Sequence, residues 1–275
     1  PSGIVAQAML QKPVRSVGLC NCPFAMEKSV KETLGLEEAE IDYVGLNHLS
    51  WLTSIRYGGK DYLRQALKDG VNSVAMKNIP ANGFDSEILQ AVRGIPSTYL
   101  EYYYFKCDKL KKLQNEKLSR GEVCLALEKE LLKKYKAPTL CVKPPELERR
   151  GGAYYSTVAV ELLEAIENDR GTRHVVNVKN AGALSFMADD DVVECAAVVG
   201  RNKIQTIPVR NFDNEHIIGL MRLMKSYEKL AVEAAVTGDR QTAIAALMLN
   251  PLCGDYRSVS SCYDEMRKVN EKFLN

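Results

Sequence analysis

The chain has 275 residues, of which 46% are hydrophobic and 26% charged, which is the composition of an ordinary globular protein. Its 37 basic and 35 acidic residues leave a formal net charge of +2. A balance this close to zero gives no reason to expect a nucleic-acid or membrane partner. The length suffices for one large domain, or for a core with an accessory lobe.

The eight cysteines have no regular spacing, and the sequence shows neither a signal peptide nor an apolar run of about 18 residues. Reduced and mostly buried thiols in a cytoplasmic protein are therefore the expected state. A disulfide between Cys20 and Cys22 is not expected. At most one of these two thiols is expected to face a site.

The first part of the chain is predicted to alternate helices and strands. Apolar spacing and the positions of proline and glycine predict a helix over residues 1–12, a strand over 15–21, a helix over 23–34 and a strand over 41–47. A hairpin-like turn at residues 57–60 and a helix carrying Tyr62 and Leu67 follow. Residues 78–83 read as a loop.

The middle of the chain is mainly helical, and the following part is rich in strands. We predict a short helix capped by Asp85, a helical aromatic run after Pro96, and longer helices over residues 119–135 and 153–167. Strands are predicted over residues 173–179, 191–199 and 203–209. The tail then forms a helix capped by Asp213, a shorter helix ending near residue 250 and a last helix over 259–273.

These elements interleave without strict strand–helix alternation, which indicates an α+β fold with a mixed or antiparallel sheet covered by helices. No strand is followed by the Gly-x-Gly-x-x-Gly pattern that binds dinucleotides, so no such unit is visible in the sequence.

Two stretches concentrate residues that can bind metal or sugar at the ends of apolar runs. Residues 17–23 supply the thiol of Cys20 and the carboxamide of Asn21, and residues 42–51 supply the imidazole of His48. A thiolate and an imidazole can together hold a divalent transition ion and leave positions open for substrate hydroxyls. The alternative is a buried inert thiol and a hydrogen-bonded core histidine.

The amino-acid sequences of these two stretches resemble those of a known family. Cys-Asn-Cys-Pro at residues 20–23 and Tyr-Val-Gly-Leu-Asn-His at 43–48 resemble the signature of glycoside hydrolase family 4, the NAD- and manganese-dependent glycosidases. The 6-phospho-β-glucosidase branch resembles the chain most. Further similar motifs occur at residues 96–103, 149–156 and 180–183. Cys22, Ala25 and Ala188 depart from the family pattern, which affects loop shape and substrate preference.

The resemblance implies a reaction that does not use the usual pair of carboxylates. NAD⁺ would remove hydride from C3 of the sugar, which acidifies the proton on C2. A base would take that proton, the bond from C1 to the leaving oxygen would break, and water and the hydride would then add back. Mn²⁺ would bind the C2 and C3 oxygens.

The resemblance also implies roles for particular residues. Cys20 and His48 match the metal ligands, and Tyr99 matches the catalytic base, which needs a nearby cation because a free tyrosine has a pKa of about 10. Asn21 stands where 6-phospho-α-glucosidases carry aspartate. A carboxamide cannot protonate a leaving oxygen, so Asn21 favours the β-branch and a substrate-binding role.

Arg120 matches an arginine near the metal and substrate, with an exposed first-turn helix residue as the alternative. The glycines at 151 and 152 offer backbone N–H groups for a sugar phosphate or an oligomer contact, or simply a helix entry.

In this family a dinucleotide-binding domain precedes the part that the chain resembles, and its second domain is similar to that of lactate and malate dehydrogenases. We therefore expect residues 1–275 to form the substrate-binding, metal-binding and oligomerisation domain of a longer enzyme, with the NAD-binding domain outside this chain. A homodimer or homotetramer acting on 6-phospho-β-glucosides is expected. The alternatives are another specificity of the family, galactosidase or α-glucosidase, and an isolated assembly module that has no activity.

Overall fold

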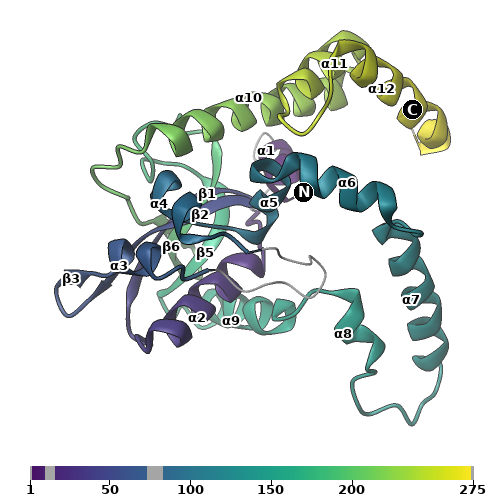
Figure 1. Cartoon of the computed structure of the whole chain (residues 1–275). Helices are drawn as coiled ribbons and strands as arrows, with labels where there is room; N and C mark the ends of the chain where they lie inside the picture. The colour runs from purple at the N-terminus through teal and green to yellow at the C-terminus, as the bar shows by residue number, and fades with distance from the viewer. Residues whose placement is uncertain (1, 10–15, 73–82, 274–275) are drawn as a thin grey trace.

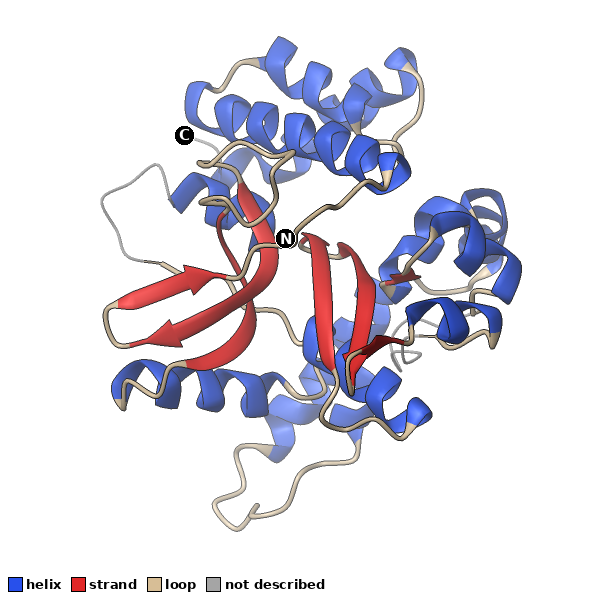
Figure 2. Cartoon of the chain, turned by 90° about the vertical axis from the view of Figure 1, so that its left-hand side faces the viewer, coloured by secondary structure: helices blue, strands red, loops and turns tan. Residues whose placement is uncertain are grey.

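The computed structural model describes residues 2–9, 16–72 and 83–273. Its seven strands form one antiparallel sheet with the order β3-β2-β1-β6-β5, to which β4 adds on β2 and β7 on β6 (Figure 2). The strands are β1 (Glu40–Leu46), β2 (Leu49–Tyr57), β3 (Lys60–Asp61), β4 (Ile95–Pro96), β5 (Thr172–Lys179), β6 (Val192–Gly200) and β7 (Lys203–Thr206).

Helices cover this sheet and extend beyond it. They are α1 (Ser2–Met9), α2 (Cys22–Leu34), α3 (Leu63–Lys68), α4 (Ser86–Val92), α5 (Glu101–Tyr104), α6 (Lys106–Asn115), α7 (Arg120–Lys134), α8 (Glu146–Arg150), α9 (Tyr155–Glu167), α10 (Glu215–Thr237), α11 (Arg240–Leu249) and α12 (Tyr256–Asn270). Two short 3₁₀ helices, η1 (Thr98–Leu100) and η2 (Glu271–Phe273), complete the described elements.

The helices lie in layers on either side of the sheet. In Figure 1, α10 lies above the strands, while α2 and α9 lie below them. α10 contacts α1 and β1, and α9 contacts β6. The sheet is therefore buried on both faces near its centre, where β1 and β6 pair. Within the described residues, no helix is both long and apolar enough to cross a membrane.

The core is built from apolar side chains that the two central hairpins and their covering helices share. Trp51, Tyr43 and Leu52 are fully buried on β1 and β2, and Met221 on α10 belongs to the same core cluster. Burial of large side chains is the main term that stabilises such a core, at roughly 1.5–3 kcal/mol for each.

Helix α7 and its neighbours form an arm. Figure 1 shows α6 and α7 extending away from the sheet and α8 lying between α7 and α9, and α7 packs against α8. Of the side chains on α7, only Leu127 and Leu131 are buried. The capping box between Ser119 and Glu122, in which each side chain accepts from the other residue's backbone N–H, fixes the start of α7.

The structure confirms the predicted α+β fold and most of the predicted elements. Gly35 ends α2 in the left-handed conformation, with φ 65°, and Asp85 caps α4 through the Ile88 N–H at 2.9 Å. The helix predicted over residues 1–12 is confirmed from 2 to 9, while its remainder and the loop predicted at 78–83 lie largely outside the described residues. The last helix begins three residues earlier than predicted, at Tyr256.

Some predictions were wrong. Residues 16–21 form no strand, because only Gly18 bridges to the sheet, through Asn177, before the backbone turns into α2. The N-cap of α10 is Asn214, one residue after the predicted Asp213. Helix α8 was not predicted from the sequence.

Candidate active site

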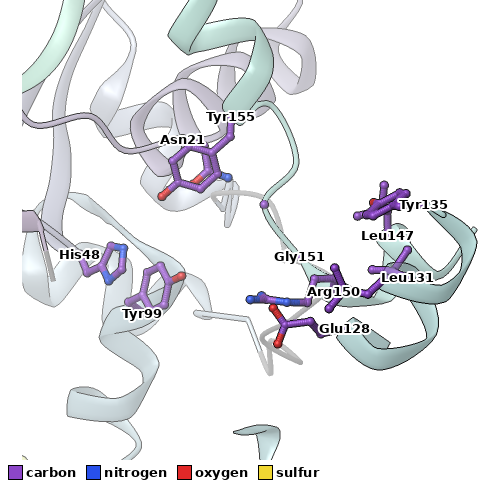
Figure 3. A pocket seen from close by; sticks show the side chains of 12 residues that line it. Asn21, His48, Tyr99, Glu128, Leu131, Tyr135, Leu147, Arg150, Gly151 and Tyr155 are labelled. Atoms are coloured by element: carbon purple, nitrogen blue, oxygen red, sulfur yellow. The ribbon is translucent and has the colours of Figure 1, made fainter. Parts of the chain in front are cut away.

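A cavity of about 570 Å³ opens between the body and the arm of the molecule (Figure 3). It combines polar groups from the sheet side with mostly apolar groups from the arm. Its lining comprises Asn21, His48, Tyr99, Glu128, Leu131, Leu132, Tyr135, Leu147, Arg150, Gly151, Gly152 and Tyr155. Three of the five predicted site residues, Asn21, His48 and Tyr99, are thus brought together in one cavity.

Asn21 sits at the N-terminus of α2 and is almost fully buried. Its side-chain Nδ2 donates to the carbonyl oxygen of Ala153 at 2.6 Å, which fixes the carboxamide against the loop before α9. An amide held in this way can hydrogen-bond a ligand but releases no proton at neutral pH.

Cys20 lies next to Asn21 but behind the cavity wall, 3% exposed. Its Sγ accepts from the backbone N–H of Cys22 at 3.4 Å. Burial, and secondly the negative charge of Glu194, raise the pKa of the thiol to about 11. Cys20 is therefore a neutral thiol at pH 7 unless a cation approaches it. All eight cysteines are free of disulfides.

His48 occupies the tight turn between β1 and β2 with a φ of 69°. A positive φ is a strained conformation for a residue with a side chain, and such strain concentrates at functional sites. The imidazole stacks on the Tyr99 ring, with centroids 3.8 Å apart and an interplanar angle of 9°. Burial lowers the pKa of His48 to about 4, so its ring is neutral at pH 7 and keeps a lone pair for a ligand.

Tyr155 is a site residue that was not singled out from the sequence. It begins α9 and lines the cavity beside Asn21 (Figure 3). Burial and the neighbouring Cys20 raise the pKa of its phenol to about 12, so it stays protonated. The sequence signal for Tyr155 was its place in the motif at 149–156, where the glycines rather than the tyrosine drew attention.

The arm supplies the opposite wall. Leu131 and Leu132 on α7, and Tyr135 at its C-cap, line the cavity, and Glu128 and Arg150 lie close to each other (Figure 3). Gly151 and Gly152 follow Arg150 with φ angles of 90° each, a conformation that favours glycine.

Arg120 is not among the lining residues. It is an exposed first-turn residue of α7, and its Nη2 donates to the carbonyl oxygens of Arg149 and Arg150 at 2.9 Å each. These bonds tie the start of α7 to the end of α8 and therefore shape the glycine loop.

The donor set of the cavity suits a transition ion only in part. The described residues contain no group of three or more His, Cys, Asp or Glu side chains arranged to hold a metal. The thiol of Cys20 and the imidazole of His48 are the soft and intermediate donors that such an ion accepts, and the remaining positions would fall to substrate and water. The residues fit an ion that is completed by its substrate.

The fold and this cavity define an α+β domain for a small polar ligand, with an imidazole, a carboxamide and two phenols at its base. Residues 43–253 match the family model "Family 4 glycosyl hydrolase C-terminal domain". The chain belongs to glycoside hydrolase family 4.

Similar proteins include both branches of the family. The probable 6-phospho-β-glucosidase of Bacillus subtilis is 35% identical over all of this chain and 64% of its own length. The 6-phospho-β-glucosidase of Thermotoga maritima, solved with manganese, NAD⁺ and glucose 6-phosphate, superposes with a TM-score of 0.87 at 29% identity, over 100% of this chain and 65% of that chain. The 6-phospho-α-glucosidase of Leptotrichia buccalis is 29% identical over 99% of this chain and 66% of its own length.

The chain thus spans about two thirds of the length of the relatives it matches.

Proposed function

We propose that this chain is the substrate- and metal-binding part of a 6-phospho-β-glucosidase that works by oxidation and elimination. The observation that carries the proposal is the convergence of Asn21, His48 and Tyr99 on one cavity in a member of this family. The higher identity to β-glucosidases, 35% against 29% for an α-glucosidase, supports the β-branch.

In this proposal Cys20 and His48 hold Mn²⁺, and the sugar is oxidised at C3 by NAD⁺ bound mainly outside this chain. Bound together, these cofactors supply a C3 ketone and its polarisation. His48 suits its role because it is already neutral at pH 7. Cys20 must lose its proton on binding, so metal affinity rises with pH.

Tyr99 acts as the base that removes the C2 proton at its phenolic oxygen. Its ring lies flat on the His48 imidazole, so a cation held by His48 would be close enough to favour the phenolate. Loss of the C2 proton then expels the oxygen attached to C1, which leaves as the alcohol once it is protonated. Water adds at C1, a proton returns to C2 and the hydride returns to C3, which completes hydrolysis and would regenerate NAD⁺.

Asn21 binds the substrate through its carboxamide, which is oriented by Ala153. Because this position carries no acid, Asn21 favours the β-branch over α-glucosidases. Arg120 acts on the substrate indirectly, by shaping the loop at Gly151 and Gly152. A galactoside specificity remains the closest alternative within the family.

A second candidate function is assembly. Apolar side chains stand exposed on α7 and the tail helices, among them Leu125 at 57% and Val236 at 72%. Such surfaces are typical of subunit contacts. We propose that the protein is a cytoplasmic homodimer or homotetramer, and that the isolated chain serves mainly as an assembly module, with little activity of its own.

The test is release of nitrophenol from an aryl 6-phospho-β-glucoside by the full-length protein, with and without NAD⁺ and Mn²⁺. We expect turnover that needs both cofactors and falls about 10²–10⁴-fold in Tyr99→Phe. Tyr102→Phe is the matched control, since Tyr102 is one helical turn further on and does not line the cavity. Turnover without NAD⁺, or none on any 6-phosphoglycoside, would contradict the proposal.

A further inference from the structure

Glu194 is a carboxylate in the centre of an apolar strand. It lies on β6, where eight of nine residues are buried, and it is itself 0% exposed. A carboxylate in the interior is costly to maintain unless hydrogen bonds and a positive charge compensate it. The contacts of Glu194 therefore indicate its role in the structure.

Three side chains donate to this carboxylate. Oε1 accepts from Asn47 Nδ2 at 3.1 Å and from Asn177 Nδ2 at 2.9 Å, and Oε2 accepts from the Tyr43 hydroxyl at 2.8 Å. The Tyr43 hydroxyl also lies 2.5 Å from Ser50 Oγ. All three donors are uncharged. Burial raises the pKa of Glu194, while these three hydrogen bonds act in the opposite direction and favour the ionised carboxylate.

Through these donors Glu194 connects the two segments that carry the proposed metal ligands. Asn47 immediately precedes His48 in the β1–β2 turn. Asn177 exchanges two backbone hydrogen bonds with Gly18, at 2.9 and 2.8 Å, two residues before Cys20. Glu194 thus lies between the Cys20 segment and the His48 turn.

The backbone is built to allow this close approach. A Cβ on Gly18 would lie 2.7 Å from the Asn177 Cβ, so a side chain there would push Asn177 away from Glu194. A Cβ on Gly45, the register partner of Glu194 in the sheet, would lie 2.3 Å from the Ser50 Cβ.

We propose that Glu194 is the positioning residue of the metal site: it fixes the Cys20 and His48 segments at the right separation and supplies a buried negative charge that favours a divalent cation beside them. The inference rests on the proposed function of Cys20 and His48. In this proposal Glu194 does not ligate the ion but acts from behind the ligand segments, with its oxygens held by Asn47, Asn177 and Tyr43. A carboxylate that orients ligands from behind typically changes metal affinity about 10–100-fold.

The test measures Mn²⁺ binding directly, by titrating the full-length protein while following the electron paramagnetic resonance signal of free Mn²⁺. Glu194→Gln keeps the size of the side chain and removes its charge. We expect its Kd for Mn²⁺ to rise about 10–100-fold, with a smaller rise in Asn47→Ser, which removes one of the three donors to Glu194. Glu101→Gln is the control, a buried carboxylate on α5 that pairs with Lys109.

Thermal unfolding first establishes that each variant is folded. If Glu194→Gln does not fold, Glu194→Asp, which keeps the charge, replaces it in the titration. Its shorter side chain is expected to raise the Kd less than Glu194→Gln does. An unchanged Kd in the folded variants would overturn the inference. Complete loss of binding in a folded variant would make Glu194 a direct ligand and also overturn it. If the wild-type protein binds no Mn²⁺, the proposed function itself fails, which is a distinguishable outcome.

Discussion

At the scale of single residues, His48 shows how the environment sets the state of a ligand. Its ring is stacked on Tyr99 and mostly shielded from water, so the charged imidazolium is disfavoured. The folded protein therefore holds His48 in the neutral form that a metal accepts.

This environment predicts a pH dependence of stability. The pKa of His48 falls from 6.5 in the unfolded chain to about 4 in the folded protein, so the unfolded state binds more protons between these values. The contribution of neutral His48 to the free energy of unfolding is therefore fully present above pH 6.5 and is lost as the pH falls toward 4. We expect urea unfolding to show that the free energy of unfolding falls more steeply with decreasing pH in the wild-type protein than in His48→Asn. Asparagine is the chosen replacement because it tolerates the positive φ at this position. Parallel pH profiles would contradict this.

Part of the site could be predicted from the sequence, and the rest could not, for a physical reason. Cys20, Asn21 and His48 sit in short motifs at the ends of apolar runs, where local pattern is informative. Tyr155 and Glu194 act through partners far along the chain, such as Tyr43, which is 151 residues from Glu194. The one available signal for Glu194 was a single acid within the apolar run Val192–Gly200.

At the scale of elements, the β1–β2 hairpin presents His48. Its two strands approach so closely at Gly45 that no side chain fits, because a Cβ there would lie 2.3 Å from Ser50 Cβ and 2.5 Å from its Cα. Sequence periodicity predicted β1 well but gave no sign of this close approach, which depends on the partner strand.

We therefore expect Gly45→Ala to destabilise the protein by about 2 kcal/mol or more, because backbone atoms must move. The matched control is Gly219→Ala on α10, where a Cβ meets nothing within 4 Å. Removing a helical glycine there should stabilise the protein by roughly 0.5–1 kcal/mol. Chemical denaturation measures both values, and equal effects of the two substitutions would refute the packing argument.

The segment before α2 shows why one predicted strand was wrong. Residues 17–20 have the apolar pattern of a strand, but Gly18 alone reaches β5, since Asn21 already adopts the helical conformation with φ −81° and ψ −15°. Pattern alone cannot tell a strand from an extended approach to a helix. This local structure suits the proposed site, because the short extended segment places Cys20 beside the cavity.

At the scale of the whole molecule, the cavity lies between a rigid sheet and a projecting arm. The start of α2 supplies Asn21, the β1–β2 turn supplies His48 and η1 supplies Tyr99, while α7 supplies the apolar wall and the glycine loop follows α8. The order of the elements in the sequence indicated a mixed or antiparallel sheet covered by helices, and the structure shows the antiparallel arrangement. The arm did not, because its position depends on contacts such as those of Arg120 with the end of α8.

The most direct test of the central claim is hydrolysis of a 6-phospho-β-glucoside by the full-length protein in D₂O, with NAD⁺ and Mn²⁺ present. If Tyr99 removes the C2 proton and solvent later returns one, the released glucose 6-phosphate will carry deuterium at C2. Hydrolysis by a pair of carboxylates leaves the C2 hydrogen in place. Release of glucose 6-phosphate without deuterium at C2 would contradict the account.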